Sequence, residues 1–340
     1  MAEIIDPITQ SWHITDKPEQ EIPVGIQKIG AKLEWELSGT MGEYSSVCVI
    51  DTGTPNHPDL KVEDSLGGDD KDGHATHVAG TICADGKIKG VAPKAKLYTA
   101  NFEDYRISEC IEWAIEKDVD VINMSFRSGE SASVKRAIEK ATEKGIICVG
   151  ASGNSGDHGV QFPATHPDVI ATGAIRENRD KTFVSSVGEE VEIVALGFRV
   201  ESTYLNEGYH KSSGTSMACP HIAGAIALMQ SKNKMLHGKR LTLEQVRAIL
   251  HSRAINLGEK GRDKKFGYGL FSFNPNIQEE LEIKMWPDKT EYKVNGETRE
   301  MDTQPTLKDG RTLVPIRFIA ETFGANVNWD SDKREITITK

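Results

Sequence analysis

Three short polar segments contain residue types that together could activate a nucleophile. They are Asp51-Thr52-Gly53, the segment around His74 and the segment around Ser216, in that order along the chain. A serine hydroxyl is a weak nucleophile until a base removes its proton, and a histidine base needs a third group to orient it. The set predicts acyl-transfer chemistry, with Ser216 as nucleophile, His74 as base and Asp51 as the orienting carboxylate.

Each segment alone has a simpler interpretation. An aspartate at a strand end is commonly a turn residue, a serine before an apolar helix is commonly an N-cap, and a single histidine is commonly structural. The ordered set of three is what favours catalysis. Small residues at 73, 80, 214, 218 and 224 would leave Ser216 accessible.

A fourth segment, residues 150–156, is rich in glycine and contains Asn154. Its amide could donate a hydrogen bond to a developing oxyanion. The alternative is that asparagine forms a left-handed turn there. His77 follows His74 at a spacing that can bind a metal, but no glutamate lies between the two histidines as in helical zinc motifs. We therefore expect His77 to be structural and predict no metal ligand.

The elements that must position these residues form an α/β pattern. Strand-like runs at 46–51, 118–126 and 145–153 alternate with helix-like runs at 77–84, 106–117, 131–144, 216–230 and 242–252. This alternation predicts a mainly parallel sheet with helices on both faces, and reacting residues gather at the carboxyl ends of such strands. We expect an N-terminal extension at 1–21, a main domain at 22–275, and a small α+β domain at 283–340 whose hairpins surround a strand and helix. The first hairpin turns at Asn295-Gly296.

Composition excludes several classes of function. The 340 residues carry 41 basic and 51 acidic side chains, a net charge of −10, which argues against a nucleic-acid binder. No apolar run reaches the ~18 residues of a membrane span. The five cysteines form no disulfide pattern, and no signal peptide is visible. We expect a cytoplasmic protein, with release or non-classical secretion as the alternative.

The motifs DTG, HATHVAGT, SGN and GTSMACPHIAG resemble those of the subtilisin-like serine proteases, over roughly residues 22–273. The resemblance implies a serine endopeptidase that cleaves proteins or peptides through an acyl-enzyme, without a cofactor for the chemistry. It assigns Ser216, His74 and Asp51 to the triad. It also places Asn154, with the Ser216 backbone N–H, in an oxyanion hole. Losing one such donor costs about 100- to 1,000-fold in turnover, a range known from subtilisin itself.

Within that family the segment EIPVGIQKIGAKLEWELSGTMG is most similar to the intracellular subtilisins. Their N-terminal extension blocks the active site until it is removed, by a segment that contains a proline. Here Ile5-Asp6-Pro7-Ile8 occupies the comparable place. The resemblance therefore implies that the first ~20 residues are inhibitory.

The resemblance also assigns six substrate-binding residues, and several depart from the family pattern; they are Ser125, Phe126, Arg127, Ser152, Gly153 and Gln161. Phe126-Arg127 replaces Leu-Gly, Gln161 replaces a glycine at the base of the specificity pocket, and the loop after residue 100 is short. Ala75 also replaces a glycine. We expect a narrowed substrate range, tilted by Arg127 and Gln161 toward polar or acidic side chains.

Two further expectations concern metals. Subtilisins commonly bind calcium in a loop after the helix of His74, but here residues 82–89 are shorter than that loop, so calcium is possible without being expected at the tight site. Residues 283–340 resemble the copper amine oxidase N-terminal-like domain. No histidine follows His251 and no cysteine follows Cys219. Copper prefers imidazole and sulfur ligands, so we expect no copper and a binding or spacer role toward a partner or surface.

Two alternatives remain at this stage. The trimmed cleft would also suit a degenerate protease fold that acts as a binding or scaffolding protein. Alternatively, the C-terminal domain is the functional part and targets the protease to a surface or partner. The complete set of triad and oxyanion residues favours the active enzyme.

Overall fold

The computed structural model describes residues 20–274, 283–294, 297–308, 311–322, 326–331 and 333–339. The chain divides into two compact units, Met1–Pro275 and Asn276–Lys340. Most of the expected N-terminal extension, including the segment around Pro7, lies outside the described residues, as does Asn295-Gly296. The domain boundaries expected from the sequence stay a prediction.

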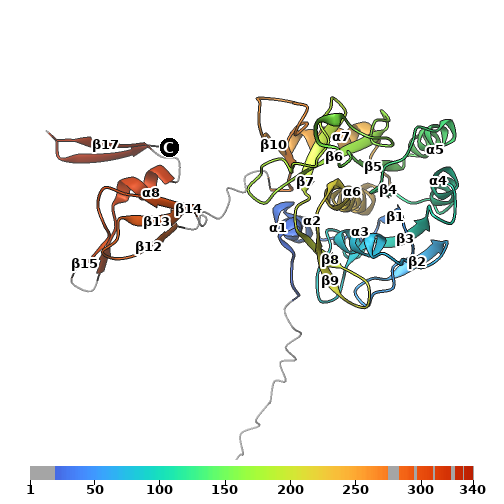
Figure 1. Cartoon of the computed structure of the whole chain (residues 1–340), viewed down its shortest axis with the longest axis horizontal. Coiled ribbons are helices and arrows are strands. Elements are labelled where there is room, and N and C mark those ends of the chain that lie inside the picture. The colour runs from blue at the N-terminus through green and yellow to red at the C-terminus, as the bar shows by residue number, and fades with distance from the viewer. Residues whose placement is uncertain are drawn as a thin grey trace, which may run out of the picture. The chain divides into compact units, whose positions relative to one another are not determined.

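The larger unit is organised around one sheet, which has nine strands within the described residues (Figure 1). In spatial order these are β10 (Ala254–Ile255), β11 (Leu270–Phe271), β7 (Val191–Leu196), β6 (Val169–Ile175), β5 (Ile147–Ala151), β4 (Val121–Met124), β1 (Ser46–Asp51), β3 (Lys96–Asn101) and β2 (Val62–Leu66). All neighbours pair in parallel except β10 with β11. The expected mainly parallel α/β fold is confirmed.

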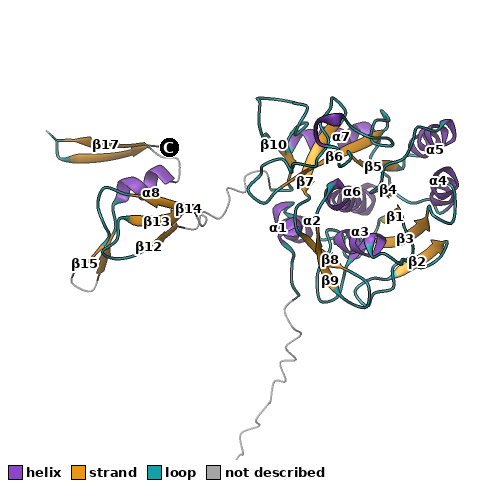
Figure 2. Ribbon diagram, viewed as in Figure 1, coloured by secondary structure: helices purple, strands orange, loops and turns teal. Residues whose placement is uncertain are grey.

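Helices cover both faces of this sheet (Figure 2). They are α1 (Val24–Lys28), α2 (Ala31–Ser38), α3 (His74–Cys83), α4 (Ile107–Glu116), α5 (Ala132–Glu143), α6 (Thr215–His237) and α7 (Leu243–Ser252), with a 3-10 turn η1 (Gly156–His158). Alternate residues of β1 point to opposite faces. Val47 and Val49 join the core beneath α3 and α6, whereas Cys48 and Ile50 join the core beneath α4 and α5.

The local sequence explains why these segments are helical. In α5 the buried residues are Val134, Ala137, Ile138 and Ala141, the spacing of one face of an amphipathic helix. Helix α6 differs, because every residue from Met217 to Ser231 is buried. It contacts β4, β5, β6 and β7 and is the central helix of the unit (Figure 1). Its first turn contains Ser216.

A two-stranded hairpin packs beside α3. It consists of β8 (Val200–Thr203) and β9 (Tyr209–Ser212). The hydroxyls of Ser202 and Thr203 donate to the backbone carbonyls of His77 and Thr76 at 2.8 Å each. This hairpin therefore fixes the helix that begins at His74.

The smaller unit contains short strands and one helix within its described residues. They are β12 (Ile283–Met285), β13 (Glu291–Val294), β14 (Glu297–Glu300), β15 (Thr306–Lys308), β16 (Arg311–Leu313), α8 (Ile316–Thr322), β17 (Asn326–Asp330) and β18 (Glu335–Thr339). β13 pairs with β14, and β17 pairs with β18, both antiparallel. Its small core contains Tyr292, Val294 and Met301. The expected order of hairpin, strand, helix and second hairpin is present.

Candidate active site

Asp51 and His74 meet at the carboxyl end of β1. Nδ1 of His74 lies 2.6 Å from Oδ1 of Asp51. The Asp51 side chain is 1% exposed, whereas that of His74 is 32% exposed. A carboxylate accepts hydrogen bonds only, so Nδ1 carries the proton and leaves the second ring nitrogen, Nε2, as the basic atom. The pair has the arrangement of a base and the group that orients it.

Two further carboxylates, Asp70 and Asp72, hold the start of α3. Asp70 accepts from the backbone N–H of Gly73 at 3.0 Å and from that of Thr76 at 2.8 Å. Asp72 accepts from the N–H of His74 at 2.8 Å. These bonds satisfy first-turn amides that have no partner within a helix. Neither aspartate was predicted from the sequence to have a role.

Gly73 provides the turn into this helix. Its φ is +86°, and a Cβ there would lie 2.4 Å from the Tyr204 ring. A larger residue would therefore be strained by conformation and by contact. Gly73 in turn fixes where His74 enters the site.

The surrounding charges alter the protonation of His74. Burial of the ring disfavours the imidazolium, but the charge of Asp51, its hydrogen bond, and the charges of Asp72 and Asp70 outweigh that effect. The net result is a raised pKa of His74. An imidazolium forming at this position is therefore stabilised by its neighbours.

Ser216 lies in the first turn of α6, and a proline four residues later changes the bonding of its carbonyl. Pro220 has no N–H, so it cannot make the helical bond to the Ser216 carbonyl. The hydroxyl of Ser125 donates to that carbonyl instead, at 3.0 Å. Ser125 is held in turn by the amide of Asn123 at 2.9 Å. The loop after β4 thus anchors the backbone of Ser216.

Ser216 itself is partly exposed. Both Ser216 and His74 are described, and no hydrogen bond joins their side chains in this structure. Bonds between a nucleophile and its base are often long in the absence of substrate and tighten in the complex. The structure therefore brings Asp51 and His74 into contact, and places Ser216 on a separate, firmly held element.

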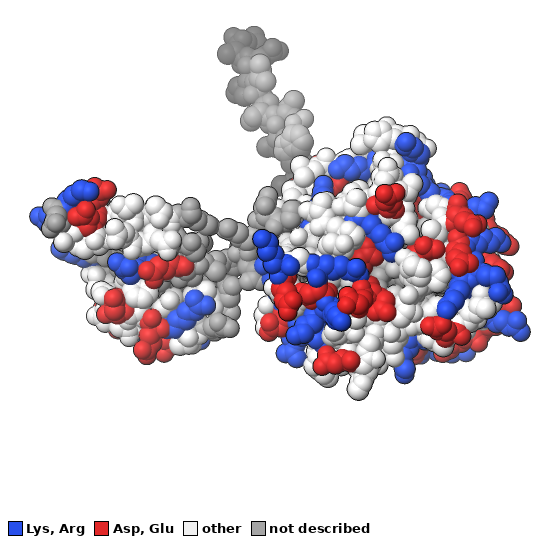
Figure 3. All heavy atoms as spheres, turned by 90° about the horizontal axis from the view of Figure 1, so that it is seen from above, with Lys and Arg blue, Asp and Glu red and all other residues white. Residues whose placement is uncertain are grey.

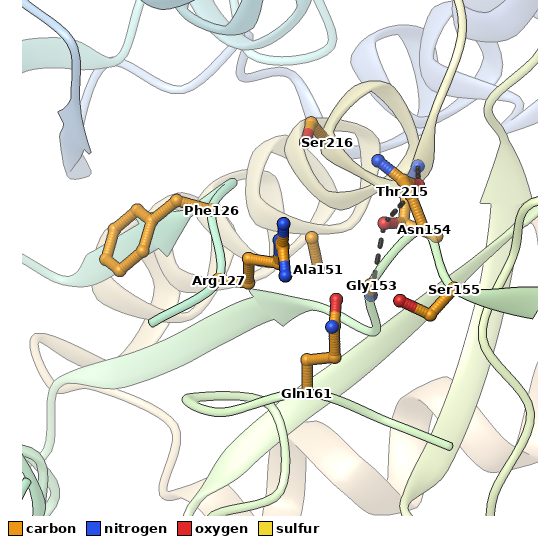
Figure 4. A pocket seen from close by; sticks show the side chains of 9 residues that line it. All are labelled: Phe126, Arg127, Ala151, Gly153, Asn154, Ser155, Gln161, Thr215 and Ser216. Atoms are coloured by element: carbon orange, nitrogen blue, oxygen red, sulfur yellow. Dashed lines mark hydrogen bonds between the residues drawn. The ribbon is translucent and has the colours of Figure 1, made fainter. Parts of the chain in front are cut away.

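Asn154 follows β5 and is oriented by the residue before Ser216. Its Oδ1 accepts from the backbone N–H of Thr215 at 2.9 Å and from the Thr215 hydroxyl at 3.0 Å. Because Oδ1 faces these donors, the Nδ2 group faces elsewhere and is a free donor. The exposed Asn154 and the start of α6 thus lie side by side (Figure 4).

A pocket of about 350 Å³ adjoins Ser216 (Figure 4). The described residues that line it are Phe126, Arg127, Ala151, Gly153, Asn154, Ser155, Gln161, Thr215 and Ser216. Four expected substrate-binding residues are among them, namely Phe126, Arg127, Gly153 and Gln161. Ser125 and Ser152 are not among them. The Ser125 hydroxyl donates to the Ser216 backbone carbonyl instead of facing the pocket. Ser152 is fully buried, and its carbonyl accepts from the Gln161 N–H at 2.9 Å.

His77 is fully buried and its Nε2 faces two backbone carbonyls, those of Val200 at 2.9 Å and His210 at 3.1 Å. Nε2 must therefore carry the proton. Burial lowers the pKa of His77 to about 4, so the ring is neutral. His77 joins α3 to the β8–β9 hairpin. Across the described ranges, no group of three or more His, Cys, Asp or Glu residues could hold a metal ion.

The loop between α3 and β3 is closed by protein groups. The Asp59 carboxylate accepts from the N–H of Ile88 at 3.1 Å and from the Tyr209 hydroxyl at 2.9 Å. Lys87 lies over the Tyr209 ring, 4.6 Å from its centroid. Asp85, in the same loop, pairs with Lys89 and Lys94. Calcium favours six to eight oxygen ligands, and these acids are already engaged by donors or cations.

Comparison with known proteins places this geometry in a class of hydrolase. Residues 42–269 match the subtilase family, and residues 277–338 match the copper amine oxidase N-terminal domain. The chain is 40% identical over 285 residues to subtilisin DY of Bacillus licheniformis, which covers 76% of this chain and all of the relative. It is 37% identical over 272 residues to a thermostable alkaline protease of Halalkalibacterium halodurans, covering 74% and 72%.

A third relative matches more of this chain. The minor extracellular protease Epr of Bacillus subtilis is 32% identical over 329 residues, covering 89% of this chain and 50% of the relative. The fold, the site and these similarities define a serine endopeptidase. The chain belongs to the subtilase family. Subtilases need no cofactor for their chemistry, although calcium binding is common in them. The particular closeness to intracellular subtilisins stays a prediction.

Proposed function

We propose that Ser216, His74 and Asp51 form the catalytic triad of this endopeptidase, with Asn154 and the Ser216 N–H as the oxyanion hole. The observation that supports this proposal best is the 2.6 Å contact between the buried Asp51 carboxylate and the partly exposed His74 ring. Serine endopeptidases need such a pair to activate the nucleophile. The free Nδ2 of Asn154, beside Ser216, supports the second assignment.

The reaction has two halves. Nε2 of His74 takes the proton of the Ser216 hydroxyl while Oγ attacks the peptide carbonyl, and the carbonyl oxygen becomes an oxyanion. Asn154 Nδ2 and the Ser216 N–H donate to that oxyanion. The intermediate collapses, the C–N bond breaks, and His74 returns its proton to the leaving amine. Water then attacks the acyl-enzyme in the same way, releasing the acid and restoring Ser216.

The acids around His74 fit this cycle. His74 is neutral at the start of both acylation and deacylation, and it is an imidazolium while the tetrahedral intermediate exists. Asp51 accepts from Nδ1 throughout, so the ring keeps its orientation while the charge comes and goes. Asp70 and Asp72 add negative potential without touching the ring, which stabilises the charged form.

The test is covalent labelling by a fluorophosphonate probe together with peptide cleavage. Wild type should be labelled, and Ser216→Ala should lose labelling and about a millionfold in kcat, the size known for the corresponding change in subtilisin. Ser213→Ala is the control, because its hydroxyl accepts from the Arg199 N–H outside the pocket. Peptide cleavage by Ser216→Ala at the wild-type rate would refute the assignment.

We also propose that the loop between α3 and β3 is closed by protein groups, without calcium. The support is the set of donors and lysines already described around Asp59 and Asp85. A cytoplasmic location is likewise a proposal, supported by five cysteines that are all buried and free. None of the helices in the described part of the chain is long and apolar enough to cross a bilayer.

The smaller unit stays a proposed binding module. Its β17–β18 hairpin exposes large apolar side chains, with Trp329 at 50% and Ile336 at 54% exposure. Such residues on a small module favour contact with a partner or surface. The inhibitory role of residues 1–21 also stays a prediction.

A further inference from the structure

We propose that the pocket beside Ser216 selects a substrate carboxylate, so that the enzyme cleaves after glutamate or aspartate. The pocket would receive the side chain of the residue before the cleaved bond. This inference rests on the proposed function and assigns a substrate class to the same site. It follows from three features of the pocket: the charge of Arg127, the unpaired amide oxygen of Gln161, and the Phe126 ring that points away.

Arg127 is the charged residue among those that line the pocket. Its side chain is exposed, and it makes no ion pair or hydrogen bond with any described residue. By contrast, the nearby Lys135 is paired with Glu130 at 2.6 Å. The guanidinium points into the pocket rather than away from it (Figure 4). A planar guanidinium suits two-point recognition of a carboxylate.

Gln161 supplies a second polar group opposite Arg127 (Figure 4). Its Oε1 is buried and has no hydrogen-bond partner among the described residues. The amide packs on Gly153, where a Cβ would lie 2.5 Å from Oε1 and φ is +108°. A half-turn of the terminal amide breaks no existing bond and presents Nε2 as a donor. Gln161 can therefore donate to a carboxylate held by Arg127.

Among the described residues that line it, no large apolar side chain points into the pocket (Figure 4). Phe126 is part of the wall, but its ring points away from the pocket and packs on Phe102, with ring centroids 4.8 Å apart (Figure 4). Ala151 contributes only a methyl group. A large apolar substrate side chain would cover the buried Oε1 of Gln161 and leave it without a hydrogen-bond partner. A substrate carboxylate can accept hydrogen bonds from both the Arg127 guanidinium and the Gln161 amide.

The experiment compares three peptides that are identical except for Glu, Gln or Leu before the cleaved bond. For wild type we expect a kcat/KM about tenfold higher for Glu than for Gln, from one charge-assisted bond in a partly exposed site. Arg127→Gln should bring that ratio close to one, and Arg127→Lys should retain part of it. Arg136→Gln is the matched control, since it removes the same charge from the exposed face of α5.

Each outcome has a distinct meaning. A Glu to Gln ratio of one or less in wild type, or an equal ratio in wild type and Arg127→Gln, overturns the selection of a carboxylate. In that case labelling of Ser216 and cleavage of the Leu peptide still support the proposed triad. If the folded wild-type protein is not labelled and cleaves none of the peptides, the proposed function itself is overturned. The labelling rate of each variant checks that its site is intact.

Discussion

Asp72 links two properties of the base, its position and its charge. Its Oδ1 accepts from the His74 N–H, and its negative charge contributes to the raised pKa of His74. The Asp70 carboxylate has the same double role toward α3. Both residues accept from backbone amides two to six residues ahead, at the start of α3. An aspartate at such a place is a local helix-start signal, but the sequence alone does not show that its charge reaches the His74 ring. By contrast, Asp51, His74, Ser216 and Asn154 were assigned their roles from residue type and order along the chain, and those roles stay a prediction.

Asp72→Asn tests the electrostatic part alone. Asparagine keeps the oxygen that accepts from the His74 N–H and removes the charge. Because the base must be neutral, activity rises with pH through the His74 pKa, and a lowered pKa moves that rise to lower pH. We therefore expect the acidic limb of kcat/KM to shift to lower pH, with the plateau within a few-fold of wild type.

The control for that profile is Glu112→Gln, which makes the same charge change at an exposed position on α4. It should leave the acidic limb in place. An acidic limb that stays unchanged in Asp72→Asn, or that moves to higher pH, would contradict the role of the Asp72 charge.

Among the elements, α6 and three of the parallel strands were predicted from the sequence pattern. Strands β1, β4 and β5 and helices α4 to α7 were expected, because their apolar periodicity is local. Strands β3, β6 and β7 were not singled out, and their burial depends on neighbours in the sheet. Expected helix 77–84 in fact begins at His74, because Asp70 and Asp72 bind its first amides.

The contact of Asp59 with the loop between α3 and β3 and with Tyr209 gives a prediction about stability. Burial, the hydrogen bond to Asp59 and its charge raise the pKa of Tyr209 to about 12, so the phenol remains a donor at working pH. Tyr209→Phe removes that donor from a buried carboxylate and should lower the free energy of unfolding by about 1–2 kcal/mol. Denaturant titration measures it, with the exposed Tyr105→Phe as control.

The same titration with and without a chelator tests whether the loop holds calcium. A loop closed by Ile88, Tyr209 and the lysines should show equal midpoints in both conditions. A large loss of stability with the chelator, reversed by added calcium, would mean that a cation is bound there after all.

At the scale of the whole molecule, the feature of interest is how the charged side chains are distributed over the surface. On the face shown in Figure 3, acidic and basic side chains are interspersed over the larger unit. The net charge of −10 therefore does not produce one acidic patch on that face. The sequence predicted the two units from the change of pattern near residue 275, while the role of the second unit depends on partners that sequence pattern does not encode.

Removal of residues 276–340 is the corresponding prediction. The proposed triad, the pocket and the core of the sheet all belong to the unit that ends at Pro275. We expect kcat/KM for a short peptide to stay within about twofold of the full chain, since the residues that bind and cleave it are unchanged. A fall of more than tenfold in a folded variant would show that the second unit takes part in the reaction.

Helix α6 has a consequence for how the enzyme fails when heated. Its first turn holds Ser216, and the following turns are buried from Met217 to Ser231. Segments that open at low cost are those with little buried surface, and this helix has a great deal. The nucleophile is therefore lost only together with the interior of the unit. In a partly inactivated sample, each surviving molecule should turn over at full speed, while the rest have no activity at all.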